Sequence, residues 1–225
     1  MVMFSTGQLL TDLSELIREA QQRGIKTLID LYHAVGAVPV DVTDLSIDFA
    51  IGGSYKYLRG GPGACWLYLN PRNLDGSMQT LDTGWFAQSD PFAFTRPDGL
   101  ELAENGDRFL ESTPAILPVY QARAGLVFTL EMGVDRLRNY SRRQQMLIEK
   151  LLCQNNIPFL GKAEQRGAFI VIPHRRAQTI VDRLKQTGVT CDAREGLIRF
   201  GPDFLNTEAE LITVVNRLVD VWKTV

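Results

Sequence analysis

Residues 52–63 have the sequence GGSYKYLRGGPG, which places Lys56 between two tyrosines and between two groups of glycines. The apolar residues 49–51 and 64–69 precede and follow this stretch and are typical of buried strands. We therefore expect the lysine on a turn between two core strands. A lysine removed from water favours its neutral amine, the form that attacks a carbonyl group or forms a Schiff base. The alternative interpretation is a surface hairpin with a solvated lysine.

A second cluster lies upstream, where residues 25–30 have the pattern of a strand that ends in the carboxylate of Asp30. His33 follows shortly after this strand end. In open parallel sheets, ligands bind beyond the carboxyl ends of the strands, so Asp30 and His33 are candidates for a binding site. An aspartate at a strand end is also a common turn former or helix cap, and a histidine in a turn can be satisfied by backbone groups.

These two clusters resemble the pyridoxal-phosphate (PLP) enzymes of the aminotransferase class V family, and most closely the kynureninases among them. Three further parts of the chain resemble the same family, and all five follow the family's order. The matching segments are residues 30–36, 54–58, 84–86, 109–116 and 191–200. The resemblance covers nearly the whole chain and implies pyridoxal 5'-phosphate as cofactor and an amino acid as substrate.

The resemblance implies catalytic roles for three residues. Lys56 would hold PLP as a Schiff base and then act as general acid and base. Asp30 would face the pyridine nitrogen and keep the ring cationic, so that the ring can accept electron density. His33 matches a family position beside the ring hydroxyl and the substrate.

The resemblance also implies binding roles. The phosphate would be bound by Tyr55, Trp85 and, from a neighbouring subunit, Ser112 or Thr113. Arg199 would hold the substrate carboxylate in a planar two-point contact that a lysine cannot reproduce. Without the family order, Tyr55 would be interpreted as a core tyrosine, Trp85 as a loop anchor and Arg199 as a surface residue.

Composition excludes several classes of function. The 225 residues carry a formal net charge of -2 with both signs interspersed, so no basic patch for nucleic acid is expected. No apolar run is long enough to cross a bilayer, and the N-terminus lacks a signal-peptide pattern. We therefore expect a cytoplasmic protein that has no membrane as a partner. The cysteines Cys65, Cys153 and Cys191 are scattered, and with two histidines they do not form a zinc site.

The alternation of strand and helix patterns predicts an α/β fold. We expect a partial, mainly parallel sheet of a PLP-binding large domain over residues 1–132, a linking helix over 133–153 and a small α/β domain over 154–225. Residues 2–4 are expected to end a strand. Further strands are expected near residues 25–30, 47–51, 64–69, 168–172 and 197–200, and helices near 12–23, 114–130, 135–153, 175–187 and 207–223.

The start of the chain corresponds to the middle of the large domain in this family. We therefore expect a gene fragment or one piece of a split protein. A sheet shortened in this way exposes an edge strand and an apolar face. The chain is expected to associate, either as a homodimer or with a missing N-terminal half.

Three functions are compatible with these patterns. The first is a kynureninase-like hydrolase that converts kynurenine to anthranilate and alanine. The second is another class V enzyme, such as an aminotransferase; a desulfurase is disfavoured because Tyr55 precedes the lysine and the cysteines lie on or beside expected elements. The third is a truncated chain without activity on its own. Within the substrate site, Arg194 is a second candidate for the carboxylate contact.

Overall fold

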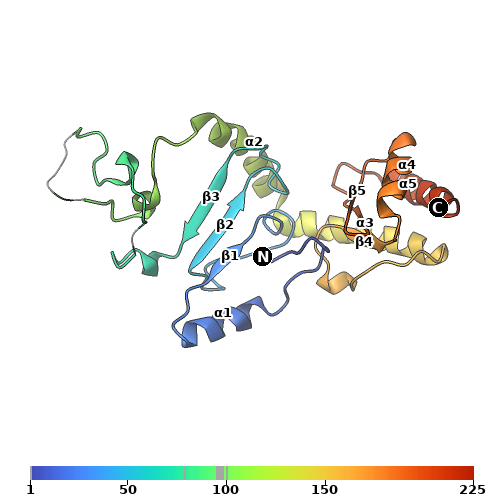
Figure 1. Cartoon of the computed structure of the whole chain (residues 1–225), viewed down its shortest axis with the longest axis horizontal. Coiled ribbons are helices and arrows are strands. Elements are labelled where there is room, and N and C mark those ends of the chain that lie inside the picture. Colours follow the sequence, from blue (N-terminus) through green and yellow to red (C-terminus); the bar gives the residue numbers. More distant parts are fainter. Residues whose placement is uncertain (1, 79, 95–98, 100) are drawn as a thin grey trace. The chain divides into compact units, whose positions relative to one another are not determined.

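The computed structural model describes residues 2–78, 80–94, 99 and 101–225, and it has the expected α/β composition (Figure 1). The chain divides into two compact units. Unit 1 comprises residues 1–11, 33–40 and 128–225, and unit 2 comprises residues 12–32 and 41–127. Residues 1–11 and 33–40 thus group with the C-terminal part of the chain and not with the other residues of the expected large domain.

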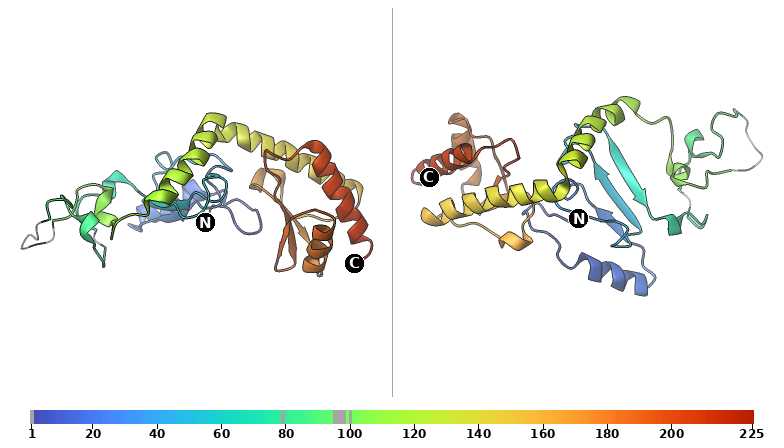
Figure 2. Two further views of the ribbon diagram at one scale, coloured as in Figure 1. Left: turned by 90° about the horizontal axis from the view of Figure 1, so that it is seen from above. Right: turned by 180° about the vertical axis from the view of Figure 1, so that it is seen from behind.

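The sheet of unit 2 contains three strands that lie side by side in all views (Figures 1 and 2). They are β1 (Leu28–Asp30), β2 (Phe49–Gly53) and β3 (Cys65–Leu69), in the order β1-β2-β3. β1 and β2 are parallel, whereas β2 and β3 are antiparallel. The sheet is therefore mixed where a mainly parallel one was expected, because the short connection from β2 to β3 contains no crossover helix.

The register of this sheet brings two chain segments to one edge. In the parallel pair, Leu28 lies opposite Phe49 and Asp30 lies opposite Ile51. The carboxyl ends of β1 and β2 therefore point to the same edge of the sheet. Lys56 follows the end of β2 at Gly53 by only three positions, so it also lies at this edge.

Hydrogen bonds of polar groups connect the strands at the opposite edge of the same sheet, where β1 and β2 begin. The Asp48 side chain is only 3% exposed and lies directly before β2. Its carboxylate accepts hydrogen bonds from the Thr27 N–H (3.0 Å), the Arg72 guanidinium (2.9 Å) and the Asn73 amide (3.3 Å). Burial opposes ionisation of this group, but the hydrogen bonds outweigh it and lower the pKa of Asp48 to about 2. Asp48 thus ties the start of β2 to the chain before β1 and after β3.

Helices α1 (Leu13–Gln22) and α2 (Ile116–Met132) confirm the two expectations near residues 12–23 and 114–130. α1 buries Leu13 and Ile17, which are one turn apart. The long connection between β3 and α2 contains the short 3₁₀ helices η1 (Pro71–Asn73), η2 (Trp85–Ala87) and η3 (Gly106–Phe109). None of the helices in the described part of the chain is long and apolar enough to cross a membrane.

Unit 1 contains a second, antiparallel sheet with the order β4-β6-β5. Its strands are β4 (Ile170–Pro173), β5 (Asp192–Arg194) and β6 (Leu197–Phe200). Its helices are α3 (Val134–Gln154), α4 (Ala177–Gln186) and α5 (Glu208–Trp222), with the 3₁₀ helix η4 at Ala163–Gln165. All expected elements of this region are present, and β5 is an additional strand.

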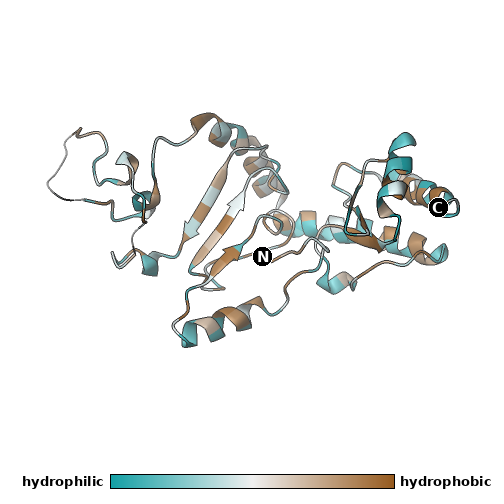
Figure 3. Ribbon diagram, viewed as in Figure 1, coloured by the Kyte–Doolittle hydropathy of each residue, from teal (hydrophilic) through white to brown (hydrophobic). Residues whose placement is uncertain are grey.

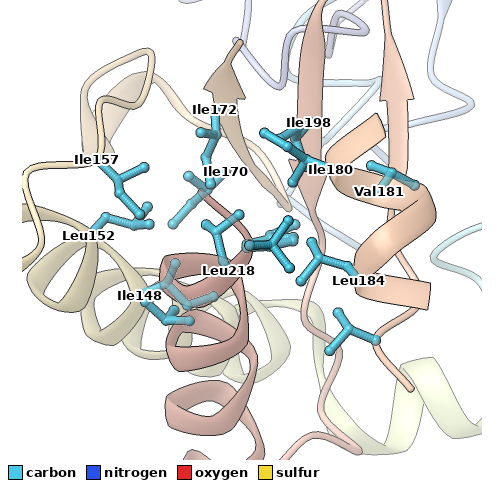
Figure 4. Close-up of a cluster of buried hydrophobic side chains, with 14 of the residues drawn as sticks. Ile148, Leu152, Ile157, Ile170, Ile172, Ile180, Val181, Leu184, Ile198 and Leu218 are labelled. Atoms are coloured by element: carbon cyan, nitrogen blue, oxygen red, sulfur yellow. The ribbon is translucent and has the colours of Figure 1, made fainter. Parts of the chain in front are cut away.

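The core of unit 1 is a continuous apolar cluster (Figure 4). Three helices and two strands of the unit each contribute fully buried side chains to this cluster. These elements are α3, α4, α5, β4 and β6. The side chains include Ile148 and Leu152 from α3, Ile170 and Ile172 from β4, Ile180 and Leu184 from α4, Ile198 from β6 and Leu218 from α5. The helix α3, which was expected as a linking helix, is therefore also part of a core.

The expectation of a strand end at residues 2–4 was wrong. This segment forms a tight turn in which the Gly7 N–H donates to the Phe4 carbonyl at 2.9 Å, and an isolated bridge joins Met3 to Leu9. The turn leaves too few residues for a strand. A second isolated bridge, between Gln8 and Arg166, holds the segment within unit 1.

Candidate active site

The turn that carries Lys56 is closed by hydrogen bonds of the buried Ser54. The Ser54 N–H donates to the Ala64 carbonyl at 2.9 Å, and its Oγ donates to the Gly61 carbonyl at 2.6 Å. The Gly60 N–H donates back to the Ser54 carbonyl at 2.8 Å. Three hydrogen bonds to one residue hold residues 54–61 in a fixed loop, which we call the lysine turn. It connects β2 with β3, as expected from the sequence.

Helix α2 packs directly against the lysine turn. A Cβ atom on Gly125 would lie 2.3 Å from the carbonyl carbon of Arg59, and one on Gly60 would lie 2.8 Å from Cα of Ala122. Such distances are too short for any side chain, so glycine is required at both positions. The glycines around the lysine thus serve the contact between the turn and the helix.

Aromatic rings surround the amino group of Lys56. Its Nζ lies 5.4 Å from the centroid of the Tyr55 ring and 5.7 Å from that of the Tyr32 ring. The two rings are 5.9 Å apart and tilted by 53°. An ammonium group at such distances is attracted to the ring faces, which limits the positions of a flexible side chain. Tyr55 is 52% exposed and is therefore not a core tyrosine.

Asp30 ends β1, and its Oδ1 accepts a hydrogen bond from the Tyr32 N–H at 2.9 Å. The aspartate is therefore a turn former, as the alternative interpretation proposed, and this hydrogen bond also orients the carboxylate. The parallel pairing of β1 and β2 brings Asp30 and Lys56 to one edge of the sheet. His33 is partly buried in a turn that belongs to unit 1.

The other expected phosphate-binding residues lie in the loops before α2. A Cβ atom on Gly84 would lie 1.1 Å from the carbonyl oxygen of Glu111, so these two segments touch. This contact brings the segment of Trp85 next to that of Ser112 and Thr113 in space, and both of these residues are exposed. The Trp85 ring packs edge-on against Phe86 and Phe92, at centroid distances of 4.4 and 5.7 Å. Trp85 thus belongs to an aromatic cluster separate from that of Tyr55.

A cavity of about 680 Å³ adjoins this second aromatic cluster. Its walls combine aromatic side chains with amide and carboxylate groups. They include Phe86, Gln88, Phe92, Asn105, Asp107 and Pro114. A mixed lining of this kind suits a small molecule with an apolar body and a few polar groups.

Arg199 lies on β6 in unit 1 and is not a surface residue, because its side chain is only 12% exposed. Its Nε donates to Asp192 Oδ1 at 2.7 Å and its Nη2 donates to Oδ2 of the same carboxylate. These hydrogen bonds lower the pKa of Asp192. The guanidinium also lies 5.2 Å from the centroid of the Phe169 ring. The guanidinium thus makes a two-point contact with the carboxylate of Asp192, and the expected contact with a substrate carboxylate stays a prediction. Arg194 is exposed and makes one contact with that carboxylate, at 3.3 Å.

Sequence reasoning did not single out Tyr32 and Cys65. The Tyr32 hydroxyl donates to Cys65 Sγ at 2.8 Å. This hydrogen bond raises the pKa of Tyr32 to about 12, so the hydroxyl stays protonated at neutral pH. For Tyr32, the sequence offered one signal, namely an aromatic residue two positions after an aspartate that ends a strand. Cys65 could not be found, because only the β2–β3 register places it opposite Gly53.

Comparison with known proteins finds relatives over most of this chain. The family model described as aminotransferase class-V matches residues 2–197. A kynureninase from Deinococcus radiodurans is 35% identical over 208 residues, which cover 88% of this chain and 49% of that protein. An uncharacterized aminotransferase, YcbU of Bacillus subtilis, is 28% identical over 216 residues, which cover 92% of this chain and 54% of that protein. The chain thus spans about half the length of the curated relatives it matches.

Solved structures share the fold at lower sequence identity. A cysteine desulfurase from Thermococcus onnurineus, determined without ligand, is 18% identical and superposes with a TM-score of 0.86 over 97% of this chain and 57% of that chain. A variant of the cystine C-S lyase C-DES, with glycine covalently linked to its PLP cofactor, is 19% identical with a TM-score of 0.82 over 97% of this chain and 58% of that chain.

Proposed function

Since this chain belongs to the aminotransferase class V family, we propose that it is part of a PLP-dependent enzyme that acts on an amino acid. Within that family we assign it to kynureninase-like hydrolysis, in which water cleaves the bond between the β- and γ-carbons of kynurenine and releases anthranilate and alanine. Kynureninases that match up to the whole chain at 30–35% identity support this assignment. The observation that carries the enzymatic role is the shared sheet edge of Asp30 and Lys56.

PLP is the cofactor of this family, and the residues of that sheet edge fit its chemistry. The aldehyde of PLP needs a primary amine, which Lys56 offers on a fixed turn. The pyridine nitrogen needs a carboxylate, which Asp30 offers in an orientation set by the Tyr32 N–H. When bound, PLP supplies an electron-accepting ring for reactions at the α-carbon of the substrate.

Each candidate residue then has a defined task. Asp30 would hold a proton on the pyridine nitrogen, and Lys56 would bind the cofactor and move protons at its Nζ. His33 would contact the ring hydroxyl and the substrate. Tyr55 and Trp85 would bind the phosphate as neutral donors, together with Ser112 or Thr113 of a neighbouring subunit. Arg199 binds the substrate carboxylate, for which its forked guanidinium is suited.

An aminotransferase is the second candidate, supported by the similarity to YcbU. A desulfurase is disfavoured, because such an enzyme needs a reactive thiolate. Burial raises the pKa of Cys191 to about 11, so this thiol stays protonated at neutral pH. The thiol of Cys65 is engaged by the Tyr32 hydroxyl.

Borohydride reduction in the presence of PLP, followed by peptide mass mapping, tests the enzymatic role. We expect the label on Lys56 and its loss in Lys56→Ala; labelling of Lys26 or Lys162 instead would refute the assignment. Activity is then measured with kynurenine, by the fluorescence of anthranilate. A labelled chain that forms a 2-oxo acid from an amino acid and no anthranilate is an aminotransferase.

We also propose that the chain associates with a second copy or with a separate N-terminal half. β1 is an edge strand that begins with the apolar residues Leu28 and Ile29, and Leu28 is 60% exposed. Figure 3 shows the hydrophobic colour of this strand. Parallel strands are normally covered on both sides. Sedimentation should therefore detect a dimer or larger species at micromolar concentration, and a stable monomer that binds no hydrophobic dye would contradict this proposal.

A further inference from the structure

Helix α3 carries a row of exposed cations, which we call the basic face of α3. Arg136, Arg143 and Lys150 are exposed and follow one another at intervals of about two helical turns, so they form one line along the helix. Arg142 is exposed beside this line. None of these four cations forms an ion pair with a residue that the structure describes.

The helix itself does not compensate these charges. Of its acidic residues, Asp135 lies in the first turn and Glu149 is bound to an arginine outside the helix. Arg136 also lies in the first turn, where the helix dipole disfavours a cation. The partly buried Arg138 adds a further positive charge, and burial together with repulsion from Arg142 lowers its pKa. A helix face that meets only water usually alternates both signs, so the basic face of α3 suits an anionic partner.

The connection between β3 and α2 has the opposite charge, and we call its residues 75–111 the acidic connection. This segment contains eight acidic and two basic residues. Asp82, Glu101, Glu104 and Glu111 are exposed there, and none of them forms an ion pair within the described part of the chain. The two signs are therefore not interspersed in these segments, although they nearly cancel in the net charge of -2.

We infer that the basic face of α3 binds the acidic connection of a second copy of this chain. The two surfaces have complementary charge, and each also exposes an apolar side chain, Met146 on α3 (59% exposed) and Phe92 in the connection (62% exposed). Contacts between protein chains commonly combine such groups. In a two-fold dimer each copy offers both surfaces, so the contact would form twice.

This inference rests on the proposed association and names the surfaces that carry it. The acidic connection leads directly to Ser112 and Thr113, which the proposed function assigns to the cofactor of a neighbouring subunit. Binding of the connection to a second copy would therefore also bring these hydroxyl groups to that copy.

Sedimentation equilibrium of the whole chain tests the inference through the dissociation constant of the dimer. Raising the NaCl concentration from about 50 to about 500 mM should raise this constant about tenfold, because salt screens the charges. Arg142→Glu combined with Arg143→Glu should raise it about ten- to a hundredfold, since like charges then face each other. Glu101→Lys combined with Glu104→Lys should raise it about threefold or more for the same reason.

A chain with all four substitutions shows whether both surfaces belong to one contact. Its loss of affinity should be smaller than the product of the two separate losses, because each reversal reduces the repulsion that the other creates. The matched control is Arg175→Glu combined with Lys185→Glu, which makes the same change of net charge at exposed sites of unit 1 outside α3. It should change the constant by less than about threefold. Glutamate and lysine are good helix formers, and circular dichroism confirms that each variant is folded.

The outcomes separate this inference from the proposed association. A monomer at micromolar concentration in low salt refutes both. A dimer that responds neither to salt nor to the reversal on α3 refutes only the inference. Independent effects of the two reversals refute it as well, because the surfaces would then bind different groups. It is also refuted if the reversal on α3 leaves the dimer intact and instead weakens binding of a separately supplied N-terminal half.

Discussion

Units 1 and 2 are stabilised in different ways. Unit 1 has a continuous core of buried aliphatic side chains from α3, α4, α5 and its sheet (Figure 4). Unit 2 buries fewer large side chains, relies on the polar contacts of Asp48 and exposes apolar residues such as Leu28 and Leu117. The candidate cofactor residues Asp30 and Lys56 lie in unit 2, which is the unit with the smaller apolar core. We expect unit 1 to be the stable part of the chain, and unit 2 to depend on pH and on association.

The largest effect should come from the core of unit 1. Leu184 on α4 is fully buried, and Leu184→Ala should lower the free energy of unfolding by about 2–5 kcal/mol because it leaves a cavity. Leu117 on α2 is 82% exposed in unit 2, and Leu117→Ala should change this free energy by less than about 0.5 kcal/mol. Urea unfolding of both variants measures the difference. Equal losses would show that the two units do not differ in this respect.

The second prediction concerns the buried arginine of unit 1. Arg199→Lys keeps the charge but loses the forked contact, so substrate binding should weaken by roughly ten- to a hundredfold, corresponding to about 1.5–3 kcal/mol. Labelling of Lys56 by PLP should not change, because Arg199 is assigned to the substrate carboxylate and not to the cofactor. The matched control is Arg194→Lys, since Arg194 is exposed and contacts Asp192 only once. The measurement is KM and kcat for kynurenine, with a separate N-terminal half supplied if the chain needs one.

An unchanged KM and kcat in Arg199→Lys would make Arg199 a structural partner of Asp192. A loss in Arg194→Lys instead would transfer the carboxylate contact to Arg194. Only an unchanged KM and kcat in both variants would restrict the role of unit 1 to that of a stable core, since Arg194 and Arg199 both belong to this unit.

The sequence predicted the elements of both units well, because their apolar patterns decide them locally. The strand expected at residues 64–69 is β3 (Cys65–Leu69), and the helix expected at 175–187 is α4 (Ala177–Gln186). It did not predict β5, whose three residues include two charged side chains and have no apolar pattern. Without β5 there was no reason to pair Asp192 with Arg199, since only the register of β5 and β6 places them opposite each other.

The candidate site could be predicted only in part, because local patterns place its residues at strand ends but do not fix how the strands pair. Asp30 and Lys56 follow apolar strands, so the sequence could place both at strand ends. Their common edge depends on the parallel register of β1 and β2, which short strands do not encode in their own residues. The contact between Tyr32 and Lys56 depends on the space left by Gly53, which is a property of packing and not of local sequence.

The smallest predicted effect is a pH dependence in unit 2. The pKa of Asp48 is lowered from its usual value of 3.8 to about 2, so its ionised form stabilises the folded state. This contribution is complete above the unfolded pKa and is lost as pH falls from about 4 to about 2. It amounts to about 2 kcal/mol. Hydrogen exchange of β2 peptides, corrected for intrinsic rates, should therefore accelerate over this range.

Asp48→Asn provides the control for this dependence. The amide cannot form ion pairs with Arg72 and Lys26, so the variant should exchange faster at neutral pH and show no further acceleration near pH 3. Peptides of α4, whose buried side chains are aliphatic, should respond much less in both proteins. The pKa of Asp192 in unit 1 is also lowered, but its side chain is 46% exposed and solvent screens its ion pair. If α4 and β2 peptides accelerate together and to the same extent, the chain unfolds as one cooperative body and the contrast between the units does not hold.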